Sequence, residues 1–306
     1  MPKRNSTARG REFGDGLRAA IAGAGLSSRA AAELADWDEA KLSELVNGKG
    51  GSSEVELALL LGICRTKPAE RDHLMELFPE TRIKGWWQQH GTCEPVRLRT
   101  FVENLAVAKT LISWQTHMVP DLLQTDSYRR AVITASANVT VGELEERVKA
   151  GLEMQQALLR PGLQSTFFLH ELALRLPVGG RDVQAEQVHH LLRMAVRSNI
   201  TLRIVPAAIG AHAGMQGPFT QLTFAKYEPL VCLRNENSTL FVEEKAAIKG
   251  YEAVIRSLDH SSLDAERSRA VIARLGEALS ASGCVNEGRD WLASQVDSAH
   301  AQGESS

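Results

Sequence analysis

The sequence predicts a mainly α N-terminal domain followed by a larger α+β domain that mixes helices with strands. Between residues 13 and 80, apolar residues recur at helical spacing and are interrupted by Gly or polar residues every few turns. Beyond residue 97, longer helical patterns alternate with short β-branched and aromatic runs that are typical of strands. A chain of 306 residues, 43% of them hydrophobic, is long enough for two such cores.

The N-terminal domain is expected to contain five short helices. The first starts at Phe13 and stops at Gly23, and the second follows Ser27 or Ser28 as its N-cap. A turn of three residues, 35–37, precedes a third helix that Asp38 caps and that ends at Asn47. Two short helices joined by so tight a turn predict helix-turn-helix geometry. A fourth helix after Ser53 and a fifth from Pro68 complete the domain.

The α+β domain is expected to alternate between the two kinds of element. Its predicted helices are Arg97–Trp114, Leu122–Ile133, Val141–Leu159, Val183–Arg197, Ala246–Leu258 and Leu263–Leu279. Its predicted strands are Ser165–His170, Ile200–Val205, Phe219–Ala225, Leu230–Leu233 and Leu240–Glu243. We therefore divide the chain into a flexible basic arm (1–12), the helix-turn-helix domain (13–80), a linker (81–96), the α+β domain (97–280) and a polar tail (281–306).

Composition excludes several classes of protein. The formal net charge of −2 gives no general attraction to nucleic acid, so any affinity for DNA must be local. The four cysteines lie far apart and form no C-x-x-C pair, which favours reduced thiols over a zinc site. The longest strongly apolar run, Leu57–Cys64, is too short to span a bilayer, so we expect a cytoplasmic protein with no membrane partner.

Motifs of catalysis are incomplete in this sequence. His170-Glu171 begins like a zinc protease motif, but Leu174 stands where the second histidine is needed. Gly48-Lys49 resembles a phosphate-binding loop, but Ser43 replaces its leading glycine. No G-x-S-x-G nucleophile elbow is present. The expectation is therefore that the chain is not an enzyme and needs neither a metal nor a cofactor.

The third helix of the N-terminal domain is the expected reader of DNA. In a helix-turn-helix, the second helix of the pair enters the major groove and its N-terminal residues reach the base edges. The arm could touch phosphate or a minor groove, or it could be a disordered tail. The predicted DNA contacts are Ser28, Arg29, Asp38, Glu39, Ala40, Lys41, Ser43, Glu44, Asn47 and Lys49, with Lys3, Arg4, Arg9 and Arg11 of the arm.

Acidic residues oppose that interpretation without excluding it. Six acids lie between residues 36 and 56 (Asp36, Asp38, Glu39, Glu44, Glu54 and Glu56) against Lys41 and Lys49, a local net charge of −4. Phosphate repels such a surface. An acidic side chain can nevertheless accept a hydrogen bond from cytosine, and Asp38 can serve as a helix cap.

The order of these motifs resembles a known family. Gly25-Leu26-Ser27, Lys41-Leu42-Ser43 and Asn47-Gly48-Lys49 resemble the XRE, or Cro/cI-like, helix-turn-helix. Residues 13–280 as a whole resemble the WhiJ-like regulators of actinobacteria. That second resemblance rests on Gly85-Trp86-Trp87, Val119-Pro120-Asp121, Tyr128, Glu146-Arg147-Val148, Gln155-Gln156, residues 170–175, Val178-Gly179-Gly180, Val205-Pro206, Gly217-Pro218-Phe219 and Ser268.

The resemblance implies a transcription regulator, in some cases antitoxin-like, that is often encoded beside a small partner protein. The chain departs from the family at several positions. Relatives carry Gln or Ser with a basic residue on the reading helix, where this chain has acids. Other departures are Asp121 in place of Gly, Gly151 and Met154 in place of Arg, and Cys232-Leu233-Arg234 in place of an aromatic residue and Glu.

Candidate partner- or ligand-binding residues lie in the linker and the α+β domain. Trp86 and Trp87 suggest either a ligand cage or a packing anchor. Glu171 and Arg175 are four apart and either form a sensing site or pair with each other. His212 lies in a Gly-rich loop, which is either a lid or a turn. The full candidate set is Trp86, Trp87, Glu171, Arg175, His212, Phe219 and Arg234.

The preferred hypothesis is a homodimeric, sequence-specific regulator, a repressor, that binds double-stranded DNA. Its C-terminal domain would bind a small protein partner or ligand that changes DNA binding. The main alternative is an antitoxin-like protein-binding module in which DNA binding is weakened or lost and which sequesters a small partner protein. A third is a receptor for a small-molecule effector.

Overall fold

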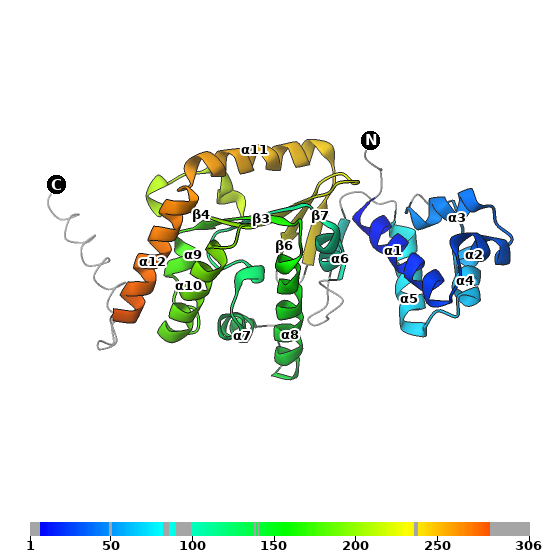
Figure 1. Ribbon diagram of the computed structural model, residues 1–306, viewed down its shortest axis with the longest axis horizontal. Helices are drawn as coiled ribbons and strands as arrows, with labels where there is room; N and C mark the ends of the chain where they lie inside the picture. Colours follow the sequence, from blue (N-terminus) through cyan, green and yellow to red (C-terminus); the bar gives the residue numbers. More distant parts are fainter. Residues whose placement is uncertain are drawn as a thin grey trace.

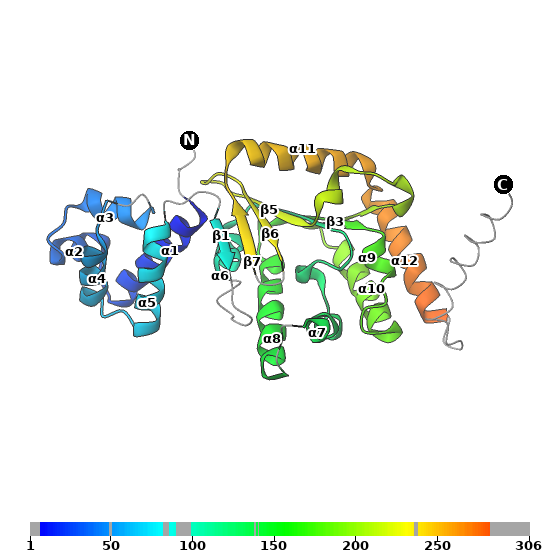
Figure 2. The ribbon, with the colours of Figure 1, turned by 180° about the vertical axis from the view of Figure 1, so that it is seen from behind.

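The structure, a computed structural model, describes residues 7–48, 51–81, 86–89, 99–137, 139, 141–235 and 238–281. It confirms a helical N-terminal domain followed by a mixed α+β domain. The helical domain lies at one end of the molecule, beside the edge of the sheet that carries β1 and β7 (Figure 1). The view from behind shows the same arrangement (Figure 2).

Five helices build the N-terminal domain, as the sequence predicts. They are α1 (Ala8–Gly23), α2 (Ser28–Leu34), α3 (Glu39–Val46), α4 (Glu54–Ile63) and α5 (Pro68–Leu77). Side chains cap most of their N-termini, because the first backbone amides of a helix have no partner within it. Ser53 and Glu56 form a complete capping box on α4. Phe13, Leu17, Leu42, Leu57 and Leu60 pack in their common core.

Among the described residues, seven strands form one mixed sheet in the order β1-β7-β6-β5-β2-β3-β4. Strand β2 pairs in parallel with β3, and β3 pairs in parallel with β4, while the remaining pairs are antiparallel. The strands are β1 (Trp86–Gln89), β2 (Thr110–Gln115), β3 (Gln164–His170), β4 (Ile200–Val205), β5 (Phe219–Thr223), β6 (Leu230–Arg234) and β7 (Ser238–Val242).

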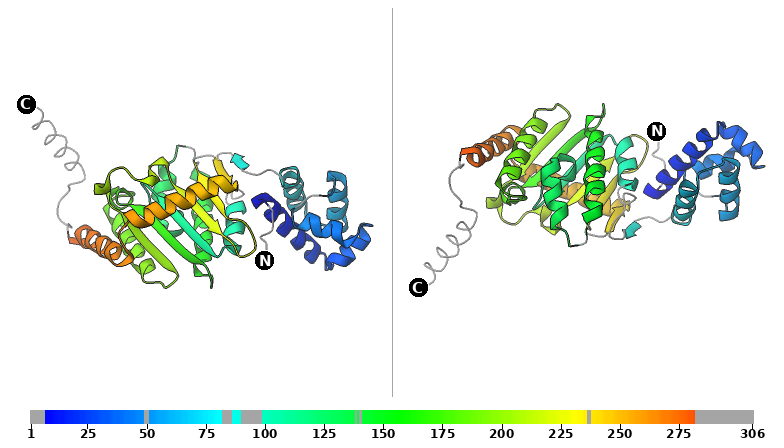
Figure 3. Two further views of the ribbon diagram at one scale, coloured as in Figure 1. Left: turned by 90° about the horizontal axis from the view of Figure 1, so that it is seen from above. Right: turned by 90° about the horizontal axis from the view of Figure 1, so that it is seen from below.

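Helices cover both faces of this sheet. The long helix α11 (Lys245–Ser261) crosses one face diagonally, and most of the other helices lie against the opposite face (Figure 3). These are α6 (Arg99–Val107), α7 (Asp126–Ala135), α8 (Leu144–Gln155), α9 (Leu172–Arg175), α10 (Arg181–Ala195) and α12 (Ala265–Ala281). Alternate side chains of each strand therefore enter two different cores.

Two cores follow from that alternation. Phe167 and Leu169 of β3 point into the larger core beneath α8 and α10, whereas Phe168 points toward α11. Trp114 of β2 is fully buried on the α11 side, together with Ile248 and other apolar residues. Two large apolar layers on opposite faces hold the sheet rigid at the centre of the domain.

The structure corrects three expectations about secondary structure. The helix predicted over Arg97–Trp114 ends at Val107, and the rest of that segment is strand β2. Leu105, Ala108, Leu111 and Ile112 recur at a spacing that suits a helix, which hid the strand. The predicted linker contains strand β1, which pairs with β7. Part of the predicted basic arm is helical, because α1 already begins at Ala8.

Candidate nucleic-acid interface

The turn between α2 and α3 holds the two helices in helix-turn-helix geometry. Asp36 adopts a left-handed conformation with φ of 56°, which reverses the chain directly after α2. The backbone N–H of Trp37 donates to the carbonyl of Ala32 at 2.9 Å. The Asp38 carboxylate then accepts the N–H of Lys41 at 2.6 Å and starts α3. The acid that seemed unfavourable at position 38 is thus a helix cap.

Helix α3 presents one face to the core and the other to solvent. Leu42 and Leu45 are each 1% exposed and anchor the helix in the domain core. The opposite face consists of exposed residues, which are Glu39, Ala40, Ser43 and Glu44. The outer face of α3 is therefore exposed, as the face of a helix that enters a groove of duplex DNA must be.

Lys41, by contrast, is committed within the domain. Its ammonium lies 2.5 Å from a carboxylate oxygen of Glu56 and 4.7 Å from the centre of the Trp37 ring. The hydrogen bond from Lys41, with those from Ser53, lowers the pKa of Glu56 from 4.5 to about 2. The predicted DNA contact by Lys41 would require this ion pair to break first.

Neighbouring charges on α2 and α3 also neutralise one another. The guanidinium of Arg29 lies 3.0 Å from Glu33 and 3.6 Å from Glu39. All three side chains are largely exposed, so this is a solvated network that phosphate could reorganise. Ser28 is also exposed, in the first turn of α2, where Ser27 supplies the cap.

The C-terminal end of α3 is held by a residue that the sequence interpretation missed. Arg18 of α1 donates to the carbonyl of Val46 at 2.7 Å and to the side chain of Asn47 at 3.3 Å. Asn47 itself donates to the carbonyl of Ser43 at 2.5 Å, so it closes the helix. An arginine one turn after Gly14 carries no motif, and only the tertiary contact reveals its role.

The predicted basic arm separates into two groups. Lys3 and Arg4, like Lys49, the predicted DNA contact after α3, lie outside the described residues. Arg9 and Arg11 belong to α1. Arg11 is only 6% exposed and hydrogen-bonds to Asn104 of α6, so the predicted DNA contact by Arg11 is wrong. Burial lowers the pKa of Arg9 to about 10.

Four of the predicted partner- or ligand-binding residues lie at one end of the strands of the sheet. Glu171 follows β3, His212 lies between β4 and β5, and Arg234 ends β6. The order and directions of the strands place all three, with Arg175, at the carboxyl ends of the parallel strands. Ligand sites of open α/β sheets often lie at these ends.

Glu171 and Arg175 pair with each other, the simpler of the two interpretations. The Nε of Arg175 donates to Glu171 at 2.8 Å, and the backbone N–H of Ala207 donates to the other carboxylate oxygen at 2.9 Å. The Ala207 hydrogen bond is the main reason that the pKa of Glu171 is lowered. Glu171 therefore ties the loop after β4 to the end of β3.

His212 lies in an aromatic cluster at the same end of the sheet, with His170 and Trp114. Its ring stacks on that of His170 with centres 5.6 Å apart and meets the edge of Trp114 at 5.3 Å. Its Nδ1 accepts the backbone N–H of Gly214 at 3.1 Å. Burial, with the neighbouring His170, lowers the pKa of His212. The Gly-rich loop is thus a packed turn that covers the end of β2.

The three remaining candidates are aromatic residues of strands β5 and β1. Phe219 is only 4% exposed and packs against Tyr251 of α11 with ring centres 5.0 Å apart, so it is a core residue and not a ligand contact. Trp86 and Trp87 lie on β1, which pairs with β7, and their side chains lie outside the described residues.

Arg234, which is exposed, takes part in a charge cluster with the partly buried Asp121 and the buried Arg129. It pairs with the carboxylate of Asp121, while Arg129 donates to the backbone carbonyl of Asp121. Arg129 packs so closely on Gly151 that a Cβ there would lie 2.1 Å from its Nη1. The departures at positions 121, 151 and 234 therefore lie together, and a small residue at 151 accommodates the guanidinium of Arg129.

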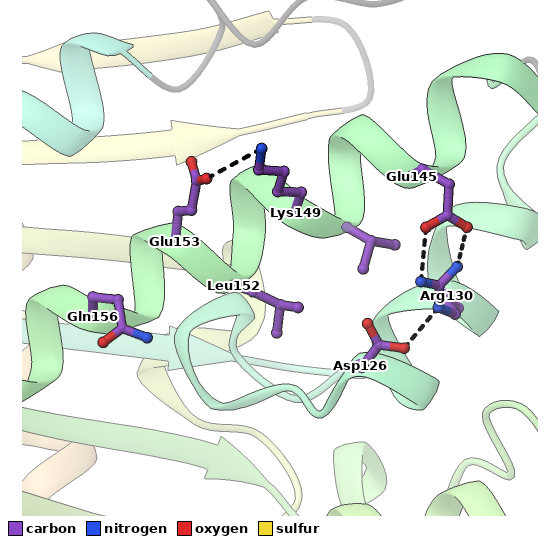
Figure 4. Close-up of a pocket in the computed structure, with 8 residues that line it drawn as sticks. Asp126, Arg130, Glu145, Lys149, Leu152, Glu153 and Gln156 are labelled. Atoms are coloured by element: carbon purple, nitrogen blue, oxygen red, sulfur yellow. Dashed lines mark hydrogen bonds and ion pairs between the residues drawn. The ribbon is translucent and has the colours of Figure 1, made fainter.

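A pocket of about 280 Å³ opens between α7 and α8 (Figure 4). Arg130 reaches across it to Glu145 and also pairs with Asp126 at 2.6 Å. Lys149 lies 4.0 Å from Glu153 on the same wall. These pairs satisfy the charges at the mouth of the pocket internally, so the pocket offers little to attract an ion.

Neither a cluster of metal-ligating side chains nor a membrane-spanning helix occurs among the described residues. They contain no group of three or more His, Cys, Asp or Glu side chains placed to hold a metal ion. None of their helices combines the length and the hydrophobicity that crossing a membrane requires.

Comparison with known families places both parts of the chain. Residues 12–74 match a family described as a helix-turn-helix domain, which supports a regulator that binds double-stranded DNA. Residues 98–274 match a family described as a domain of unknown function, DUF5753. No curated protein and no solved structure matches the chain. Because the second match covers more than half of the sequence, this protein belongs to the DUF5753 family, and it carries a helix-turn-helix domain at its N-terminus.

Proposed function

We propose that this protein is a cytoplasmic, sequence-specific transcription repressor of the XRE type, similar to the WhiJ-like actinobacterial regulators. It binds double-stranded DNA as a homodimer, and its C-terminal domain binds a small protein partner or ligand that modulates this binding. The observation that carries the proposal is the exposed outer face of α3, anchored from behind by the buried Leu42 and Leu45. A recognition helix needs this combination of rigid seating and a free face.

The charge distribution shapes what this face can recognise. Ala40 and Ser43 are small enough to approach base edges, while Glu39 and Glu44 flank them with carboxylates that accept from cytosine amino groups. Few cations of the described helix-turn-helix face phosphate directly, because Lys41 and Arg29 already pair with acids. We therefore expect modest affinity with a shallow dependence on salt.

Matched substitutions test the contact. Ala40 and Ala246 are both exposed and both the second residue of a helix, α3 and α11. An aspartate at either place suits a helix N-terminus, so neither change should unfold the protein. Ala40→Asp should weaken binding to the protein's own upstream DNA at least about tenfold in a mobility-shift assay, because it adds charge against phosphate. Ala246→Asp should bind like the parent.

The same assay distinguishes the main alternative. If the parent shifts no DNA even at low ionic strength while a small protein co-purifies with it, the antitoxin-like sequestering module is the better description. The acidic outer face of α3, with Glu39 and Glu44 exposed, is the observation that favours this alternative. If Ala40→Asp and the parent bind the DNA with equal affinity, α3 does not form the DNA interface.

A stripe on α4 supports the homodimer. Val55 is 79% exposed and Leu59 54% exposed, and Ala58 and Gly62 are exposed between and beyond them. These four positions follow the spacing of one helical face. Isolated exposed apolar residues are ordinary, but a stripe with this periodicity is typical of a contact with another helix.

Charges at the two ends of the stripe specify its occupant. Glu54 is exposed at the start of α4, and Arg65 and Lys67 are exposed just beyond its end. In a two-fold pair of antiparallel α4 helices, Glu54 of each copy would face the basic end of the other. The stripe is therefore complementary to itself, and we propose a second copy of this chain as its partner.

A further inference from the structure

Helix α1 is seated on the C-terminal end of α3 at backbone-contact distance. A Cβ on Gly14 would lie 2.1 Å from the carbonyl oxygen of Val46, and a Cβ on Gly48 would lie 2.5 Å from the Cα of Gly10. Side chains at these glycines would therefore force the helices apart. Arg18 adds its hydrogen bond to Val46. The position of the reading helix is consequently set by the position of α1.

The N-terminal part of α1 also contacts the α+β domain, through the side chain of Arg11. Its Nε and Nη2 donate to the side-chain oxygen of Asn104 on α6 at 3.0 and 2.9 Å. Its Nη1 lies 3.6 Å from Glu243, which follows β7. Its guanidinium lies 5.0 and 5.1 Å from the ring centres of Phe224 and Tyr227, in the connection between β5 and β6. Three separate segments of the α+β domain thus surround one side chain.

The next residue strengthens this contact. Glu12 is 3% exposed, and one of its carboxylate oxygens accepts from Thr100 of α6. The other oxygen lies 3.0 Å from Nε2 of His73 on α5. Glu12 therefore joins α6 of the α+β domain to α1 and α5 of the helical domain.

Buried charges make the junction specific in geometry. Burial lowers the pKa of Arg11 and the nearby Glu243 raises it, so the counter-charge offsets part of the desolvation. A buried guanidinium or carboxylate is tolerated only while its hydrogen bonds and counter-charge are in place. Rotation of one domain on the other would break several of these contacts together.

We propose that Arg11 is a positioning residue for DNA binding, which locks α1 to the α+β domain and thereby fixes the orientation of α3. A partner that displaces α6, the connection around Phe224 or the chain at Glu243 would then move the reading helix. This inference rests on the proposed function, because it assigns the route by which the α+β domain controls that same DNA-reading face.

The direct test measures the junction without DNA. Cys93 and Cys284 are replaced by Ser, and spin labels are attached at exposed positions 43 and 257, one on each domain. The distance distribution between the labels should be narrow in this parent and broader in Arg11→Lys, which keeps the charge but loses the forked donor. Asn104→Ala, made from the other side of the junction, should broaden it too. Arg267→Lys, at an exposed arginine on α12, is the control and should leave it unchanged.

DNA binding without labels then separates positioning from simple packing. Arg11→Lys should lose about tenfold in affinity for a two-half-site operator, a coupling within the usual range. Its affinity for a single half-site should stay within about twofold of the parent, because α3 itself is intact. Unchanged distances and operator affinity in Arg11→Lys would overturn the inference. A parent that binds no DNA would contradict the proposed function, while the distance distribution would still decide whether Arg11 locks the domains.

Discussion

Charged residues around α3 are mostly engaged in contacts within the helical domain. Asp38 caps the helix, Lys41 pairs with Glu56, and Arg29 bridges Glu33 and Glu39. These contacts leave the local net charge of −4 unchanged, because Lys41 and Glu56 are both already counted in it and Arg29 is balanced by Glu33. Glu44 is an exposed acid of α3 that remains on the reading face, so discrimination between bases should depend on it and on its small neighbours.

The pair between Lys41 and Glu56 predicts a specific pH dependence. The pKa of Glu56 is lowered to about 2 in the folded protein, so its carboxylate stabilises the fold above its ordinary value of 4.5. This contribution is lost as the pH falls from 4.5 toward 2, because protonation removes the ion pair. Urea denaturation across that range should show a smaller loss of stability in Glu56→Gln than in the parent.

Glu266→Gln on α12 is the control for that measurement. Glu266 is exposed and forms no ion pair with the described residues, so its replacement should leave the pH dependence of the parent unaltered. A Glu56→Gln protein whose stability falls with pH as steeply as that of the parent would contradict the assigned role.

Helices and strands differ in how far the sequence predicts them. The five N-terminal helices and most later elements were predicted within a few residues, because caps, prolines and glycines mark their ends. Strand β2 was missed because Leu111 and Ile112 continue the helical spacing of α6. Pairings such as Arg11 with Asn104, 93 residues apart, follow from tertiary packing and leave no local pattern. The sequence predicted which face of α3 is exposed, whereas it did not predict the partners of the charges on that face.

Replacement by alanine is expected to have opposite effects on stability at two helical glycines, Gly14 at the contact of α1 with α3 and Gly250 in α11. Gly14→Ala places a Cβ against the Val46 carbonyl and should destabilise the protein by about 1–3 kcal/mol through overpacking. Gly250 lies within α11, and a Cβ there meets nothing within 4 Å. Gly250→Ala should therefore stabilise the protein by about 1 kcal/mol, the difference in helix propensity. Thermal unfolding of the two variants measures both effects, and a neutral Gly14→Ala would refute close packing at this point.

At the scale of the whole molecule, the two candidate contact regions lie at opposite ends of the strands of one sheet. Arg11 and Glu12 contact the end of the sheet at which β5 and β7 finish, near Phe224 and Glu243. Glu171, His212 and Arg234 lie where the parallel strands end. An effector bound there would act on the reading helix across the rigid sheet, whereas a partner at α6 would act on Arg11 directly. These two regions would give the proposed regulator two separate routes of control.

Selection from a random library of duplexes tests the central claim most directly. The parent should enrich an inverted repeat whose half-sites are centred about 34–36 Å apart, or a multiple of that distance. Val55→Glu, which charges the stripe on α4, should enrich single half-sites, whereas Val196→Glu, at a similarly exposed valine of the α+β domain, should select like the parent. An inverted repeat that Val55→Glu enriches as strongly as the parent would contradict the α4 dimer, and no enriched sequence from the parent at low ionic strength would contradict DNA reading by α3.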